Sequence, residues 1–189
     1  FKFVGDVNTG GYSAPDMTIL AEHVTEGGIV QMAFQQEPDS VVWCVRNDGT
    51  LLGLTYRREE EVVAWHKHVI GGAFSGGQAV VESITTLPTD TGEDELFMIV
   101  KRTINSVTKR YIEKLKLFDF GDSTETAFFV DSGLSYSGGA TTTLSGLYHL
   151  EGEALQVLGN GATHPNKTVS GGGITLDYSS TKAAVGYGF

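Results

Sequence analysis

Residues 41–57 read VVWCVRNDGTLLGLTYR and decide the fold class. Apolar residues alternate on both sides of Asp48-Gly49, as they do in strands whose successive side chains point to opposite faces. Asp-Gly favours a two-residue loop of type I′, because both of its residues tolerate positive φ. The stretch therefore predicts an antiparallel hairpin, with strands over 41–47 and 50–57 and with Trp43 buried.

The hairpin belongs to a run of four short strands, and a second run follows it. The first run covers 29–34, 41–47, 50–57 and 62–70, and the second covers 79–87, 95–103, 107–117 and 126–130. A four-stranded unit that repeats after roughly fifty-five residues is typical of a β-propeller. We therefore expect an all-β fold in which residues 1–118 form two four-stranded antiparallel sheets, a partial β-propeller.

A short helix is expected before the first run, over residues 13–24. Ser13 would be the N-cap, Pro15 would lie in the first turn, and Asp16 at N3 would complete a weak capping box. Gly27-Gly28 would end the segment.

The composition changes after Leu117, where lysine and arginine become rare and glycine, serine and threonine increase. Short strands are indicated over 154–158, 167–169, 173–178 and 182–186, with a turn at Asn160-Gly161. We expect residues 119–189 to form a second, small β domain that resembles a barrel or a compact sandwich.

The charge of the chain restricts its partners. The 189 residues include 23 acidic and 13 basic side chains, for a net charge of −10. Such a surface does not bind a phosphate backbone through counterion release, so no tight nucleic-acid binding is expected. No apolar run approaches the roughly 18 residues that a membrane span needs, so no membrane partner is expected.

Because the chain starts with Phe1, we expect it to be a piece of a longer protein.

Candidate metal and cofactor residues are few. Cys44 is a single cysteine, expected to be buried and inert. His66 and His68 would share one face of a strand, but the sequence indicates no third metal ligand. Residues 161–168 resemble a P-loop with Asn166 in place of a glycine and with no helix after it. The sequence therefore predicts no catalytic, cofactor-binding or metal-binding residues and no cofactor.

Other motifs have ordinary structural interpretations. Asn166-Lys167-Thr168 is a glycosylation sequon without a secretory context. The acids at 90 and 93–95 lack the spacing of an EF-hand, which favours a solvated loop. Trp43 and Trp65 could form a sugar platform, although core packing is the commoner role for strand tryptophans.

Three stretches together carry a family resemblance. They are VWCVRNDGTLLGLTY (42–56) with VAWHKH (63–68); VESI (81–84) with MIVKRTIN (98–105) and RYIEKL (110–115); and LSGLYHLEG (144–152) with VLGNG (157–161). In this order they resemble structural proteins of tailed phages and prophages, in particular the tail nozzle, or second tail-tubular protein, of short-tailed phages.

The resemblance implies a propeller-type platform with an inserted small β domain, and a structural role in the virion tail. It further implies a longer chain that forms a homo-oligomeric ring with other tail proteins, assembled in the cytoplasm of the bacterial host. Copies in a ring would surround the channel through which DNA leaves, and an acidic wall would not retain DNA. The resemblance supplies no catalytic residues.

Two alternatives to a structural virion protein stay open. One is a host-surface module that binds glycan through Tyr136, Tyr148 or Trp65. The other is a glycan hydrolase, whose paired carboxylates need not be close in sequence. A binding module needs exposed aromatic side chains on one rim, whereas an enzyme needs polar groups that converge in a cleft.

Overall fold

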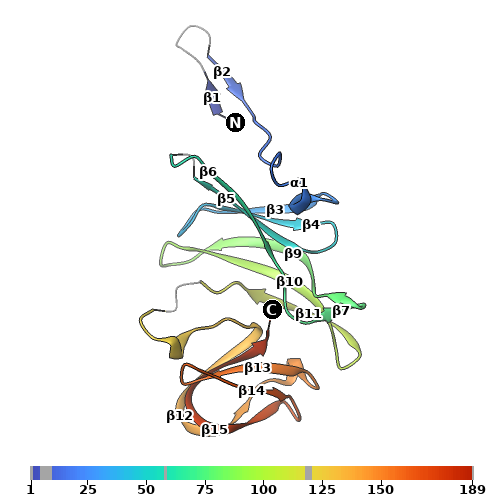
Figure 1. The fold of residues 1–189 in the computed structure, drawn as a ribbon, viewed down its shortest axis with the longest axis vertical. Coiled ribbons are helices and arrows are strands. Elements are labelled where there is room, and N and C mark those ends of the chain that lie inside the picture. The colour runs from blue at the N-terminus through green and yellow to red at the C-terminus, as the bar shows by residue number, and fades with distance from the viewer. Residues whose placement is uncertain (1, 5–9, 58, 118–120, 189) are drawn as a thin grey trace.

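The computed structural model describes residues 2–4, 10–57, 59–117 and 121–188. The chain is mostly β and its strands pair antiparallel, which confirms the all-β prediction. Figure 1 shows the sheets arranged as successive layers, with the hairpin of β1 (Lys2–Val4) and β2 (Gly11–Ser13) extending from one end.

The first sheet has four strands in the order β3-β4-β5-β6, as predicted. Their bounds are β3 (Ile29–Gln35), β4 (Val41–Arg46), β5 (Leu51–Arg57) and β6 (Val62–His68). One row of the register runs Ala33, Trp43, Gly53, His66 across the sheet. Gly53 is required in this row, because a Cβ there would collide with the His66 ring. Trp43 is buried, as predicted.

The loop between β4 and β5 differs from the prediction. Arg46 N–H donates to the Thr50 carbonyl (2.9 Å) and Gly49 N–H donates to the Arg46 carbonyl (2.8 Å), which closes a three-residue loop. Gly49 has φ of 83°, whereas Asp48 does not adopt positive φ. This is a type I turn followed by a left-handed glycine, so the predicted two-residue type I′ loop is wrong. The Asp48 carboxylate accepts from Thr50 N–H (3.0 Å) and thereby holds the turn.

The second sheet has three strands in the order β9-β10-β11, so the predicted second four-stranded unit is wrong. Its strands are β9 (Val80–Pro88), β10 (Asp94–Ile104) and β11 (Val107–Lys114), and a small hairpin of β7 (Ala73–Phe74) and β8 (Gly77–Gln78) precedes them. The fourth strand expected over 126–130 is replaced by the 3₁₀ turn η1 (Thr124–Thr126) and a stretch without strand structure over 127–130. Ser123 caps this turn by accepting from Glu125 N–H (3.3 Å), which favours a turn over an extended strand.

The helix is shorter than predicted. Only α1 (Glu22–Thr25) is helical, and Ser13 ends β2 rather than capping a helix. The Asp16 carboxylate accepts from both the backbone N–H (2.8 Å) and the hydroxyl (2.7 Å) of Thr18. This local side-chain bonding supports a turn and competes with helix formation at the expected start. No helix among the described residues is long and apolar enough to cross a membrane.

The C-terminal unit is a four-stranded sheet in the order β12-β15-β13-β14. It consists of β12 (Asp131–Ser145), β13 (Ala154–Gly159), β14 (Ala162–Thr168) and β15 (Gly173–Tyr187), with the 3₁₀ turn η2 (Tyr148–Leu150) after β12. The two strands expected over 173–186 are one continuous strand. Asn160-Gly161 forms the predicted turn, with φ of 48° and 77°.

Two hydrophobic cores hold the layers together. Val41, Trp43, Val45 and Leu51 of the first sheet pack against β9 and β10, which contribute Val81, Ile84, Leu96, Met98 and Val100. The C-terminal core contains residues of β12, β13 and β15 and also Ile104 of β10. β10 therefore contributes to both cores. The predicted boundary between 118 and 119 lies outside the described residues, so the division into domains stays a prediction.

A buried ion pair lies where the second sheet meets the C-terminal unit. The Arg102 side chain is completely buried, forms an ion pair with Glu113, and donates to the Gly71 carbonyl (2.7 Å). Its guanidinium also lies 5.5 Å from the ring centroid of Tyr187 in β15. Removing one partner of such a pair would leave a buried charge uncompensated, so substitution of either residue is expected to be strongly destabilising.

Candidate interaction surface

The two histidines singled out by sequence lie side by side and pack against a core aromatic ring. His66 Nδ1 and His68 Nε2 are 2.8 Å apart, and the rings lie 5.7 and 5.2 Å from Trp43. Burial, together with the neighbouring His66, lowers the pKa of His68 to about 4, and burial also lowers that of His66. When both imidazoles are neutral, the N–H of one ring can donate to the unprotonated nitrogen of the other. The pair therefore fits a packing role.

No third ligand joins these histidines in the part of the chain that the structure describes. Within that part, no group of three or more His, Cys, Asp or Glu side chains is arranged to hold a metal ion. That the protein binds no metal stays a prediction from the sequence.

The P-loop-like segment and the acidic loop have structural surroundings. Residues 162–168 of the former belong to β14, and Asn166 is exposed on that strand. In the acidic loop, the Asp94 carboxylate accepts from Gln36 N–H (2.7 Å), so it connects two turns. Glu95 pairs with Lys114 at 2.8 Å. These contacts give the acidic loop a role in the fold.

The aromatic residues considered for glycan binding differ in exposure. Trp65 is half-buried and its Nε1–H donates to the Met17 carbonyl (2.9 Å). The Tyr136 hydroxyl donates to the Gly139 carbonyl (2.7 Å). Tyr148 is 75% exposed, and one face of its ring lies against Gly172. The three side chains belong to separate elements, and Tyr148 is the one among them with a free aromatic face.

The segment 14–28, called the strap here, crosses the outer face of the first sheet, the face turned away from the second sheet. Two side chains of that face hold it: Trp65 of β6, through Met17, and Arg46 of β4. Figure 1 shows α1 of the strap on this side of the first sheet. The side chains on this face of the sheet include Cys44, Leu52 and Leu54, and all three are buried. The strap therefore covers apolar surface of the sheet. The predicted burial of Cys44 is confirmed.

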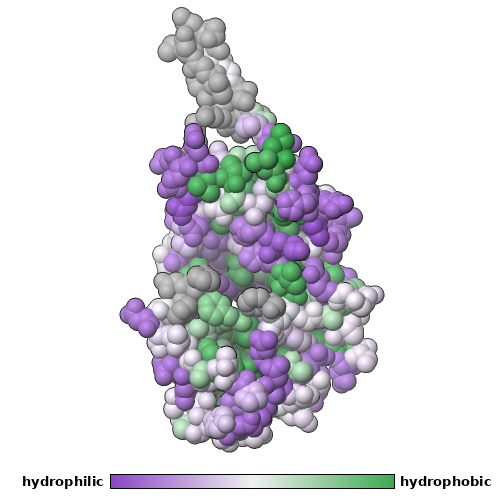
Figure 2. All heavy atoms as spheres, viewed as in Figure 1, coloured by the Kyte–Doolittle hydropathy of each residue, from purple (hydrophilic) through white to green (hydrophobic). Residues whose placement is uncertain are grey.

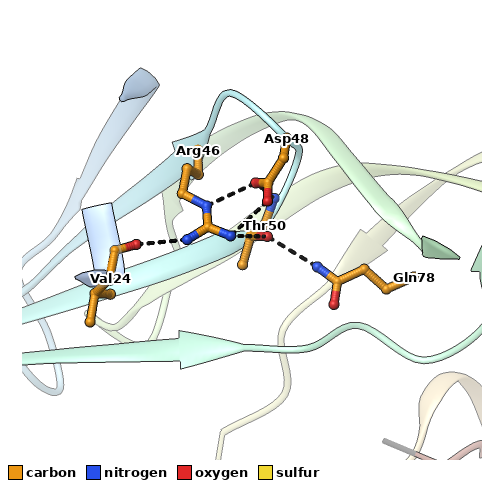
Figure 3. Close-up of polar contacts among 5 residues, drawn as sticks. All are labelled: Val24, Arg46, Asp48, Thr50 and Gln78. Carbon is orange, nitrogen blue, oxygen red and sulfur yellow. Dashed lines mark hydrogen bonds and ion pairs between the residues drawn. The ribbon is translucent and has the colours of Figure 1, made fainter. Parts of the chain in front are cut away.

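Arg46 connects the strap to the β4–β5 loop (Figure 3). Its Nη1 donates to the Val24 carbonyl (3.0 Å), while Nε and Nη2 donate to the two Asp48 carboxylate oxygens (3.0 and 2.6 Å). Thr50 accepts from Arg46 Nη2 (3.3 Å) and from Gln78 Nε2 (3.0 Å). A shallow groove of about 340 Å³ beside this cluster is lined by Val30, Val80 and Glu82, among others. Because the Arg46 guanidinium is already engaged at each of its nitrogens, it is not a free ligand-binding group in this groove.

Several apolar side chains of the strap and of the two edge strands of this face remain exposed. We call this set the outer apolar patch: Ile19, Leu20, Met32, Phe34 and Val63. Leu20 is 92% exposed, Met32 66% and Phe34 54%. β3 contains no charged residue. Figure 2 shows hydrophobic side chains gathered at the end of the molecule where the N-terminal segment joins the layers. Exposed apolar side chains gathered on one face are a feature of protein interaction sites.

The outer face of the second sheet is different. Glu82 forms ion pairs with Lys101 (2.7 Å) and Arg110 (2.6 Å), and the Glu95–Lys114 pair lies on the same sheet. The Arg110 and Lys101 hydrogen bonds lower the pKa of Glu82 to about 2. A face with charged pairs is suited to water, whereas the outer apolar patch is not. This contrast was not predicted, although β4 and β5 are near-continuous apolar runs, which are typical of strands covered on both faces.

No protein-family model and no curated protein matches this chain.

Proposed function

We propose that this chain is a structural component of a larger protein assembly, and that the assembly is the tail of a phage virion. The observation that carries the proposal is the outer apolar patch, in which five apolar side chains of the strap and of the outer face of the first sheet are exposed. Apolar side chains gathered in this way are commonly covered by another protein. The sequence resemblance to tail nozzle proteins supplies the kind of assembly.

The layered sheets support the same proposal. Two antiparallel sheets packed face to face through one core are what adjacent blades of a β-propeller present. In a propeller each blade has a neighbour on both faces, so the outer apolar patch would be the contact of the first blade with a further sheet. The C-terminal unit would be the small barrel-like domain inserted beside the blades.

The charge of the chain fits the wall of a DNA channel. With a net charge of −10 the protein repels a polyanion at short range, and a passing duplex would not adhere. Copies arranged as a ring would therefore guide DNA without retaining it.

The test uses phage particles produced by the host that encodes the chain. Mass spectrometry of purified particles is expected to find its peptides, and gold-labelled antibodies against the chain are expected to mark the tail. Peptides found in the cell lysate and missing from intact particles would contradict the proposal.

A second candidate function, glycan binding, is favoured by one observation. The exposed ring of Tyr148, backed by Gly172, offers the flat aromatic face that sugars stack on. If Tyr148 stacks on sugars, Tyr148→Ala should abolish binding to host-surface polysaccharide. The control is Tyr178→Ala, at a tyrosine that is 72% exposed, which should leave binding unchanged. If the unsubstituted protein retains no polysaccharide, this candidate is rejected.

A further inference from the structure

We propose that His164 closes a side-chain seam between β14 and β15, and that the seam opens when the imidazole of His164 is protonated. His164 belongs to the P-loop-like segment, to which the proposed function gives no role. Such a seam would operate in the isolated protein, whatever assembly the protein joins.

The seam joins two strands that do not pair with each other. In the sheet order β12-β15-β13-β14, β13 separates β14 from β15, and His164 is aligned through Val157 with Val185. From Val185 back to Asp177, a straight strand would span about 26 Å. The Asp177 N–H nevertheless donates to His164 Nε2 over 3.0 Å. β15 must therefore curl, so that its first half reaches β14.

The imidazole takes the place of a neighbouring strand at this point. Neither of the two ladders of β15, with β12 and with β13, includes residues 176–179. His164 Nε2 accepts from the backbone N–H groups of Asp177 (3.0 Å) and Tyr178 (3.4 Å) in this gap. Without the imidazole these amides would lie on an unpaired strand edge.

The contacts of His164 require one neutral tautomer. Its Nδ1 lies 3.1 Å from the Pro165 carbonyl, which can only accept, so Nδ1 carries the proton. Its Nε2 faces two backbone N–H groups, which can only donate, so Nε2 is unprotonated. A second proton would bind at Nε2, remove the acceptor and point an N–H at two other N–H groups. Protonation of the ring is therefore incompatible with the seam.

The charged groups around the ring are the carboxylate of Asp177 in β15 and the ammonium of Lys167 in β14, which pair at 2.5 Å. β13 contributes no charged residue, and the Tyr178 ring lies edge-on with its centroid 5.7 Å away. The hydrogen bond from Lys167 and, to a smaller extent, the charge of His164 lower the pKa of Asp177, so this carboxylate stays ionised where histidine titrates. It attracts a protonated imidazole, although the Lys167 ammonium opposes that attraction. In acid the ring can therefore exchange its backbone partners for the carboxylate.

Hydrogen exchange of the full 189-residue chain tests the seam. The protection of the Asp177 and Tyr178 amides, each corrected for the intrinsic exchange rate at that pH, is expected to fall at least about fivefold between pH 8 and pH 5. The amides of residues 183–185, which belong to the β12 and β13 ladders, should keep their protection.

His164→Gln does not titrate in this range. The protection of the two amides should therefore become independent of pH, whether or not the glutamine side chain accepts from them. The matched control is His149→Gln in the same unit. His149 Nε2 donates to the Ser132 carbonyl (2.8 Å), a contact that survives protonation, so this variant should keep the pH dependence of the seam.

A second measurement needs no variant. Nitrogen NMR of the His164 ring in the unsubstituted protein at pH 8 should show the proton on Nδ1, and a proton on Nε2 would overturn the seam. Equal protection of the Asp177 and Tyr178 amides at pH 8 and pH 5 would also overturn it, as would a pH dependence retained in His164→Gln. A parallel loss of protection at residues 183–185 would mean that the whole unit unfolds, which is likewise incompatible with a local opening.

Discussion

At the scale of single residues, Trp43 connects the first sheet to the inter-sheet core. It is buried beside Val41 and Val45, and its Nε1–H donates to Gln35 Oε1 (2.8 Å). We expect Trp43→Ala to lower the free energy of unfolding by roughly 3–5 kcal/mol, because it removes a large buried ring and leaves a cavity. Urea denaturation measures this. Tyr148→Ala is the control, expected to change stability by less than about 0.5 kcal/mol because its side chain is exposed.

The pKa of His68 predicts how stability depends on pH. A histidine whose pKa is lowered to about 4 on folding binds fewer protons in the folded state than in the unfolded state, where its pKa is 6.5. The contribution of His68 to the free energy of unfolding is therefore fully present above pH 6.5 and is lost as the pH falls toward 4. Because His68 keeps partial contact with solvent, the loss is on the order of 1–2 kcal/mol.

His68→Phe tests this prediction, since phenylalanine keeps an aromatic ring beside Trp43 and does not titrate. The free energy of unfolding of the variant should change less between pH 7 and pH 5 than that of the unsubstituted protein. Equal slopes for the two proteins would show that the acid sensitivity has its source in other groups.

At the scale of elements, the strap depends on Arg46. We expect Arg46→Met to loosen residues 14–28 while the first sheet stays folded, because the substitution removes the bond to the Val24 carbonyl and keeps much of the apolar stem. The measurement is hydrogen exchange of the strap amides, which should become faster. Lys182→Met, which removes an exposed ion pair with Glu125, is the control and should not affect the strap.

The predicted boundary between the two β units can be tested by limited proteolysis. We expect cleavage between 117 and 126 to leave two folded pieces, because the composition changes there and the buried residues of the C-terminal core, apart from Ile104, all lie after the cut. The paired strand β12 should be protected. Cleavage scattered over both halves, with neither piece surviving, would indicate one continuous domain.

How far the sequence predicted these elements depended on what stabilises each one. The four strands of the first sheet were predicted because alternation and turn residues are local signals. β12 and the full length of β15 were not, because β12 is rich in glycine, serine and threonine and is extended by pairing with β15. The helix was overpredicted because the side-chain bonds of Asp16 favoured a turn. The outer apolar patch was missed because exposure is decided by where the strap lies.

At the scale of the whole molecule, the acidic charge predicts weak binding to duplex DNA. At about 150 mM salt the screening length is roughly 8 Å, so only direct contacts with basic side chains would retain DNA. Lys101, Arg102, Arg110 and Lys114 are each already paired with Glu82, Glu95 or Glu113. A gel-shift titration should detect no complex at micromolar protein. A tight complex would mean that basic side chains gather on one face.

An assay for released reducing sugar separates the structural proposal from a glycan hydrolase. We expect no release when the protein is incubated with host-surface polysaccharide. Release that persists in the purified protein would reject the structural proposal and make the acidic residues candidates for catalysis.

The strap also gives the protein a built-in chemical reporter. Cys44 has no solvent exposure, it is the single cysteine of the chain, and burial raises the pKa of its thiol. A thiol-reactive dye can therefore modify it only when the outer face of the first sheet opens. The rate of labelling measures how often the strap lifts, without any engineered label.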